Sequence, residues 1–219
     1  MKNIFFTLTI ILLITTSKTQ AQNDSIFSWK SGNIKYKRSI KPADLDSITF
    51  KTPLHFLQLG QHYQGGVIFY FFNVGEPGYI AGEQHGLIAA TADIFSPVAF
   101  YWEATVYIRT TGATGTALGT GLSNTNLIIE TMGNDIYAAK FCRDYKGGGY
   151  RDWFLPSKDE LNKLILNNTL VDDFATYYPY WSSTETSPTT ALSQSFFNGV
   201  NSSAGKSTWV AKTRAVRRF

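Results

Sequence analysis

Strand patterns lie at both ends of the main part of this sequence, and helix patterns lie between them. The strand patterns cover residues 67–72, 79–81, 87–90, 195–197, 209–211 and 213–219. Asn198-Gly199 follows the fourth of these and is the strongest short signal for a two-residue hairpin. Strands at both ends, with helices and long Gly-, Ser- and Thr-rich loops between them, predict an α+β domain whose terminal strands can pair.

Two helices are expected from apolar periodicity. Residues 134–145 place Ala138, Phe141, Cys142 and Tyr145 on one face, and three glycines at 147–149 end the helix. The pattern therefore predicts that Cys142 is buried. Asn124 is expected to cap a shorter helix through residues 127–129, after the Gly/Thr-rich loop 111–121.

A third helix begins at the stretch RDWFLPSKDEL, residues 151–161. Ser157 and Glu160 have the spacing of a capping box, in which each side chain binds a free backbone N–H of the other residue. The apolar residues that follow at the spacing of one helix face are Leu161, Leu164 and Ile165, and Asn167-Asn168 ends the pattern. Arg151, Asp152 and Trp153 precede the cap, and either brace the loop or contact a ligand.

The N-terminal residues 1–21 have the pattern of a secretory signal peptide: Lys2, an apolar run over residues 4–14 and a small residue, Ala21. The run is shorter than the roughly 20 residues of a spanning helix. We therefore expect cleavage near Ala21, no transmembrane segment in the mature chain, and a periplasmic, outer-surface or secreted protein. The whole chain has a net charge of +4, and the signal peptide contains two lysines and no acidic residue, so the net charge of the mature chain is about +2. Because this basic excess is small, a nucleic-acid partner is not expected.

Residues 22–59 read as a small β segment or spacer before the main domain, residues 60–219. Alternating residues flank Ser31-Gly32-Asn33, which is hairpin chemistry, and residues 46–50 read as another short strand. An extended spacer is the alternative.

Metal, phosphate and nucleophile sites are weakly indicated. The three histidines have no metal-ligand spacing with each other or with Cys142, the one cysteine, so no metal, cofactor or disulfide is expected. The 111–121 loop lacks the Gly-Lys-Ser/Thr ending of a phosphate-binding loop and reads as structural. A buried Cys142 would make a poor nucleophile.

Residues 177–185, YYPYWSSTE, combine aromatic rings with hydroxyls and a carboxylate, as a glycan surface would. In the alternative interpretation Trp181 belongs to the core and the polar residues after it form a strand edge. The basic residues near the C-terminus are expected on a solvated strand face, with an anionic glycan as the alternative partner; they are Lys212, Arg214, Arg217 and Arg218.

Six segments of the chain, taken in order, carry a resemblance to a known family: YQGGVIFYF, HGLIAA, TGATGTALGTGLSNTN, YAAKFCRDYKGGGYRDWFLPSKDEL, YWSSTE and RAVRRF. Together they resemble the Lcl C-terminal domain family over about residues 60–219. The family takes its name from a bacterial collagen-like adhesin. The resemblance implies a C-type-lectin-like fold with paired first and last strands, two to three helices and a long loop region that carries the ligand surface. It also implies an exported or surface protein; the named adhesin binds sulfated glycans and host surfaces.

The sequence departs from two functional types within that fold. Glu76-Pro77-Gly78 lacks the amide of the carboxylate-Pro-amide motif, and no Trp-Asn-Asp triplet is present, so a calcium-bridged sugar site is not expected. A single cysteine likewise excludes the cysteine pair of formylglycine-generating enzymes.

The sequence thus predicts a non-catalytic, adhesion-type binding protein, whose partner is a glycan, an anionic one included, or a surface protein. The expected ligand-binding residues are Arg151, Asp152, Trp181, Ser183, Glu185 and Asn198. One alternative is a structural or assembly module of an envelope complex without a soluble ligand. Another is a hydrolase that uses paired carboxylates such as Asp152 and Glu185.

Overall fold

The computed structural model describes residues 25–31, 34–40, 56–94, 99–103, 109–171, 173–175 and 177–219. The chain divides into two compact units, Met1–His55 and Phe56–Phe219. The expected signal peptide and the strand expected at residues 46–50 lie outside the described residues.

The first unit contains an antiparallel hairpin of β1 (Ser25–Ser31) and β2 (Ile34–Ile40). Its register pairs Ser25 with Ile40 and Ser31 with Ile34. The hairpin predicted from the alternating pattern is therefore confirmed.

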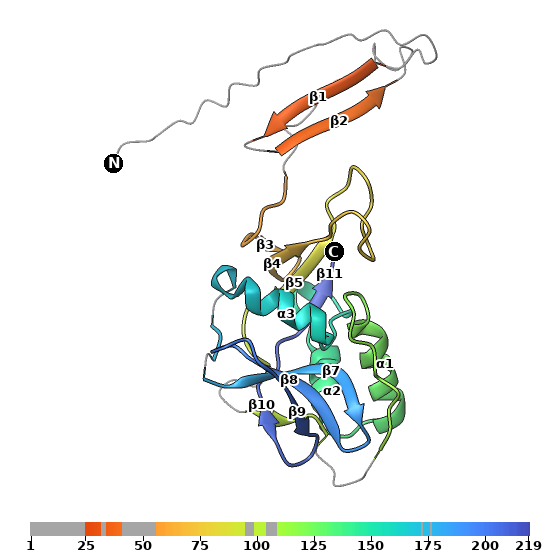
Figure 1. Ribbon diagram of the computed structural model, residues 1–219, viewed down its shortest axis with the longest axis vertical. Coiled ribbons are helices and arrows are strands. Elements are labelled where there is room, and N and C mark those ends of the chain that lie inside the picture. The colour runs from red at the N-terminus through yellow and green to blue at the C-terminus, as the bar shows by residue number, and fades with distance from the viewer. Residues whose placement is uncertain are drawn as a thin grey trace, which may run out of the picture. The chain divides into compact units, whose positions relative to one another are not determined.

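In the second unit, one antiparallel sheet joins the start of the unit to its C-terminal strand (Figure 1). Its strands, in the order β11-β5-β4-β3, are β11 (Val216–Arg218), β5 (Gly86–Ala90), β4 (Gly66–Phe71) and β3 (His62–Tyr63). The last strand pairs with β5, the strand predicted at residues 87–90, so the prediction that strands from the two ends pair is confirmed. The pairing of the first strand with the last, which the family resemblance implies, is wrong. The strand predicted at residues 79–81 is also wrong. These residues lie in the loop between β4 and β5, where Gly75, Gly78 and Gly82 all have positive φ.

A second sheet consists of β7 (Pro179–Ser187), β8 (Thr190–Ser195) and β9 (Asn201–Gly205) in sequential antiparallel order. The connection from β8 to β9 is longer than the two-residue turn predicted at Asn198-Gly199. Ser195 N donates to Val200 O over 3.0 Å, and the loop between them carries the buried Phe196. A separate pair, β6 (Phe100–Tyr101) with β10 (Val210–Ala211), adjoins β7 through a bridge between Tyr180 and Lys212.

Within the described residues, three α-helices and two short 3₁₀ turns connect the sheets. They are α1 (Gly121–Met132), α2 (Ala138–Asp144), η2 (Gly147–Gly149), α3 (Lys158–Leu166) and η3 (Asn168–Leu170). The α3 helix lies between the two larger sheets and contacts β4, β7 and β8 (Figure 1). The three helices and several antiparallel sheets of the described part make this an α+β chain, as predicted.

The capping box at the start of α3 is confirmed. Glu160 N donates to Ser157 Oγ, and Ser157 N donates to Glu160 Oε2 over 2.9 Å. Glu160 is buried, and its other carboxylate oxygen accepts from Gly119 N at 2.9 Å. The same side chain therefore starts the helix and holds the Gly/Thr-rich loop against it.

Asn124 does not cap a helix, because α1 begins three residues earlier and contains it. The buried Asn124 amide instead donates to Gly115 O at 2.7 Å and accepts from Gly115 N at 3.2 Å. An amide can satisfy both backbone groups of one residue, so this side chain fixes the loop. The structural reading of the loop agrees with this arrangement.

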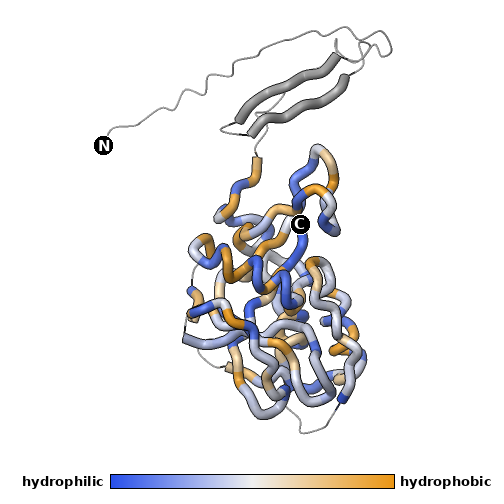
Figure 2. The backbone as a smooth tube through the Cα atoms, viewed as in Figure 1, coloured by the Kyte–Doolittle hydropathy of each residue, from blue (hydrophilic) through white to orange (hydrophobic). Residues whose placement is uncertain are grey.

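Two apolar clusters form the core of the second unit. One contains Trp102, Trp153 and Trp181 with residues of α1 and α2, and the other joins β4, β5 and α3. Figure 2 shows short apolar stretches alternating with polar ones along the described residues of the second unit. No helix among the described residues has the length and apolar character needed to cross a membrane.

Candidate functional site

The six residues expected to bind a ligand lie in three places in the structure. Trp181, Ser183 and Glu185 are buried on β7. Arg151 and Asp152 are exposed in the segment before α3, and Asn198 is exposed in the β8–β9 loop. The structure therefore does not gather them into one site.

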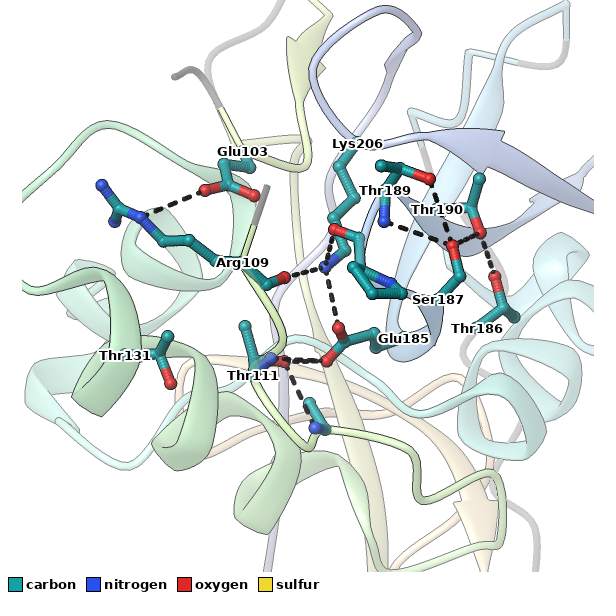
Figure 3. A network of polar contacts seen from close by, with 12 residues as sticks. Glu103, Arg109, Thr111, Thr131, Glu185, Thr186, Ser187, Thr189, Thr190 and Lys206 are labelled. Atoms are coloured by element: carbon teal, nitrogen blue, oxygen red, sulfur yellow. Dashed lines mark hydrogen bonds and ion pairs between the residues drawn. The ribbon is translucent and has the colours of Figure 1, made fainter. Parts of the chain in front are cut away.

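Glu185 belongs to a closed polar network (Figure 3). Lys206 Nζ lies 2.9 Å from Glu185 Oε1 and also donates to the carbonyl oxygens of Arg109, at 2.9 Å, and Pro188, at 3.0 Å. The ammonium group sits 4.7 Å from the centre of the Trp102 ring. With three oxygen acceptors and an aromatic face, the three donors of the lysine are used inside the protein.

The second carboxylate oxygen of Glu185 is held by Thr111. Thr111 N donates to Oε2 at 2.8 Å, and the Thr111 hydroxyl donates to the same atom. Burial raises the pKa of the Glu185 carboxyl, but the hydrogen bonds from Thr111 and Lys206, together with the lysine charge, outweigh it and leave the pKa below its ordinary value. Glu185 is thus an ionised structural anchor between β7 and the loop at residue 111.

Trp181 and Ser183 are also used internally. The Trp181 indole N–H donates to Phe100 O at 2.8 Å, and its side chain is fully buried. Ser183 N donates to Pro156 O at 2.7 Å, while Ser183 Oγ accepts from the Asn124 amide at 3.2 Å. A ring must reach solvent to stack on a sugar, so the stacking role expected of Trp181 is wrong and the residue belongs to the core, as in the alternative interpretation.

Asp152 is half exposed and forms an ion pair with Arg217 Nε. The Arg217 guanidinium also donates to Gln64 Oε1 and lies 3.8 Å from the centre of the Tyr150 ring. The neighbouring Trp153 is fully buried. This segment therefore braces β11 against the loop before α3, and Arg151 is the exposed side chain that it presents.

The basic residues near the C-terminus do not form the solvated strand face that was expected. Lys212, Arg214 and Arg217 are all buried, and Arg218 is partly buried. Arg214 Nε donates to Asp93 Oδ1 at 2.8 Å, and Tyr180 Oη donates to Asp93 Oδ2 at 2.7 Å. A buried cation needs an anionic or hydrogen-bonding partner of this kind. The sequence pattern of one strand does not show such partners, because they come from distant parts of the chain.

Cys142 is fully buried on α2, as predicted, and burial raises the pKa of its thiol far above the ordinary value. Among the described residues, no group of three or more His, Cys, Asp or Glu side chains could hold a metal ion.

Several exposed apolar side chains lie around the ends of β7, β8 and β10, and two of them, Tyr177 and Tyr178, belong to the aromatic segment 177–185 considered above for a glycan surface. We call this set the aromatic rim, and it comprises Tyr101, Tyr177, Tyr178, Phe197, Val200, Trp209 and Val210. Tyr177 is 89% exposed, Phe197 77% and Trp209 51%. Large aromatic side chains this open to solvent are typical of binding surfaces when they occur together.

Strand pairing brings these residues together. Pro179 pairs with Ser195, which sets Tyr177 and Tyr178 beside the loop that carries Phe197 and Val200. Val210 pairs with Tyr101. Lys212, two residues after Val210, places its ammonium group 5.4 Å from the centre of the Tyr178 ring, so the two groups of apolar residues adjoin.

No protein-family model matches the chain, and no curated protein matches it. Among solved structures, the chain is similar to the crystal structure of a fimbrial protein from Bacteroides ovatus, with 16% sequence identity and a TM-score of 0.49. The similarity covers 88% of this chain and 56% of the fimbrial protein, so this chain spans little more than half of that length. The resemblance to the Lcl C-terminal domain family therefore rests on the motifs alone.

Asn198 is the expected ligand residue that lies within the aromatic rim. Its side-chain oxygen accepts from Val200 N at 3.1 Å, and the side chain is exposed beside Phe197. A sequence signal for the rim existed in the paired aromatics Tyr177-Tyr178 and Phe196-Phe197. The sequence did not distinguish these exposed aromatic residues from their buried neighbours Phe196, Tyr180 and Trp181, because burial depends on packing between distant segments.

Proposed function

We propose that this chain is an exported, non-catalytic binding protein of the adhesion type, which recognises a glycan or a protein ligand through the aromatic rim. The observation that carries the proposal is the solvent exposure of Tyr177 and Phe197 at the adjoining ends of β7 and β8, together with that of Trp209 just before β10. Aromatic side chains supply large contact area at low conformational cost and dominate the energetics of many binding surfaces. Export is inferred from the N-terminal pattern of residues 1–21.

The polar groups that could have served catalysis are engaged in the fold, which supports a non-catalytic role. Glu185 and Asp152, the carboxylates considered for a hydrolase, are ion-paired with Lys206 and Arg217. The Cys142 thiol is buried, and burial raises its pKa, so little thiolate forms at neutral pH.

A C-type-lectin-like fold is the architecture that we propose for residues 56–219. The C-terminal strand β11 lies in the same sheet as β3 and β4 from the start of the unit, and loops without regular secondary structure occupy much of the middle. These features support the motif resemblance, whereas the pairing of β11 with β5 is a departure from the expected strand order.

The test compares the purified protein with a Tyr178→Ala/Trp209→Ala double variant on arrays of glycans and of purified extracellular proteins. Tyr79→Ala removes an exposed tyrosine from the β4–β5 loop and is the matched control. We expect the double variant to lose binding by about tenfold or more while the control binds as wild type. Equal binding of the double variant and the wild type, with unchanged circular dichroism, would refute a role for the rim.

The alternative of an assembly module is favoured by a second exposed apolar site. The β4–β5 loop carries Val74, 80% exposed, and Ile80, 48% exposed, on an ordered turn in which Glu76 accepts from Tyr70 Oη. A subunit that contacts two neighbours head to tail needs two different surfaces. If Val74→Ser/Ile80→Ser and the rim variant each abolish a common oligomer in size-exclusion chromatography, the assembly function is the correct one.

A further inference from the structure

The segment that builds the aromatic rim is almost free of charge. Between Phe174 and Ala211 the charged residues are Glu185 and Lys206, whereas the overall proportion of 16% would give about six in a stretch of this length. This stretch contains β7, β8, β9 and β10. Most of the second sheet and most of the rim are therefore built from uncharged residues.

The two charges that are present are removed from the surface. Glu185 and Lys206 pair with each other at 2.9 Å, and each side chain is 2% exposed. Lys212, just beyond the segment, is 3% exposed, and its ammonium group lies beneath the Tyr178 ring. A ligand at the rim thus meets aromatic faces and neutral polar groups, with the nearby cation covered by a tyrosine and the exposed Asp173 just outside the segment.

The neutral polar groups of the segment are hydroxyls and amides. Thr186 Oγ1 is hydrogen-bonded to Thr190 Oγ1 and to Ser203 Oγ, both at 2.7 Å, on the surface of the β7-β8-β9 sheet (Figure 3 shows the first pair). Asn198 follows the exposed Phe197 in the loop at the other end of β8, and Asn201 follows the exposed Val200 at the start of β9. Hydroxyl and amide groups both donate and accept hydrogen bonds, as the hydroxyls of a sugar require.

We propose that the ligand of the aromatic rim is an uncharged glycan. This inference rests on the proposed function and narrows it. A sulfated or carboxylated glycan is recognised by exposed Arg and Lys side chains, which form charge-assisted hydrogen bonds with anionic groups. In place of exposed Arg and Lys side chains, the rim offers aromatic faces and neutral hydrogen-bonding groups. It would therefore recognise a sugar by stacking on the ring and by hydrogen bonds to the sugar hydroxyls.

The salt dependence of binding distinguishes an uncharged glycan from an anionic one. Binding that relies on exposed charges weakens as salt screens them, whereas stacking and neutral hydrogen bonds are little affected. The matched probes are dextran and dextran sulfate, which share a backbone and differ in charge, together with the neutral polysaccharides mannan and laminarin.

The experiment measures binding of the purified protein to these four immobilised polysaccharides at low and high salt, with the Tyr178→Ala/Trp209→Ala variant and the Tyr79→Ala control. The expected result is binding to at least one neutral polysaccharide, insensitive to salt, and reduced about tenfold or more in the rim variant alone. Binding confined to dextran sulfate and abolished by salt would overturn the inference, as would the absence of binding to every neutral probe.

The proposed function and this inference fail in different ways. If the rim variant loses a protein ligand on the array while no neutral polysaccharide binds, the inference is wrong and the binding role of the rim stands. If a neutral polysaccharide binds equally to wild type and rim variant, the inference is wrong, and the rim's binding role is wrong as well when the arrays show no ligand that the rim variant loses. Oligomers dispersed by the rim variant, without polysaccharide binding, would identify a second copy of the chain as the occupant.

Discussion

Lys206 Nζ and Glu185 Oε1 are 2.9 Å apart in a position where each side chain is 2% exposed. Two charges in such a place are costly to remove from water, and the cost is offset only while both remain paired and hydrogen-bonded. The pair joins β7 to the segment that follows β9, and Thr111 extends it to the Gly/Thr-rich loop. It therefore links three segments that lie far apart in the sequence.

Replacing one member of this pair should be far more harmful than replacing both. Lys206→Met leaves a buried carboxylate without its cation, and we expect a loss of about 3–5 kcal/mol in the free energy of unfolding, measured by urea denaturation. Lys206→Met/Glu185→Leu should recover part of that loss. Lys140→Met breaks the more exposed pair with Asp144 and should cost less than about 1 kcal/mol. Equal losses for Lys206→Met and Lys140→Met would contradict this prediction.

Acid should weaken the fold through Glu185. Its pKa in the folded protein lies below the ordinary value of 4.5, because hydrogen bonds from Thr111 and Lys206 and the charge of Lys206 outweigh the effect of burial. A carboxyl with a lowered folded pKa contributes stability above its unfolded pKa and loses it as pH falls through the folded value. The free energy of unfolding should therefore fall more steeply below pH 4.5 in the wild type than in Glu185→Gln. Parallel pH profiles for the two proteins would show that Glu185 is not responsible.

The capping box of α3 should contribute measurably to stability. Ser157→Ala removes the hydroxyl that accepts from Glu160 N, and we expect a loss of about 1 kcal/mol. Glu160→Ala should cost more, since it leaves Ser157 N and Gly119 N without their acceptor. Ser123→Ala, on the exposed side of α1, is the control and should change the free energy of unfolding by less than about 0.5 kcal/mol.

Cys142 should be unreactive in the folded protein. The side chain is fully buried, and burial raises the pKa of the thiol. A disulfide reagent such as DTNB should therefore modify it only in denaturant, or at the rate of unfolding. A Ser123→Cys/Cys142→Ala variant presents a thiol on an exposed position of α1 and should react at once. Rapid reaction of native Cys142 would show that α2 opens readily.

Features that depend on residues close in sequence were predicted correctly. The capping box connects Ser157 with a residue three positions away, and the apolar face that buries Cys142 repeats every three or four residues. The β1–β2 hairpin likewise pairs residues across a short turn. In each case the local pattern contains both partners of the interaction, so the sequence alone specifies the geometry.

Features that depend on distant partners were missed. Arg214 is neutralised by Asp93, which lies 121 residues earlier, and Arg217 by Asp152, 65 residues earlier. A strand pattern with three arginines looks solvent-exposed until those partners are known. The same reason explains the error at Trp181, since Trp181 and Trp209 both occur in β-type patterns and differ only in what packs over them.

The lack of charge from Phe174 to Ala211 also affects how this chain behaves at high concentration. Within the described residues, β9 has a strand neighbour on one side only, and its exposed residues are Asn201, Ser202 and Ser203. Natural sheet edges commonly carry lysine or proline, which prevents edges of separate molecules from pairing. β9 carries neither lysine nor proline. The lack of charge that suits a neutral ligand therefore also leaves this strand edge without electrostatic protection against self-association.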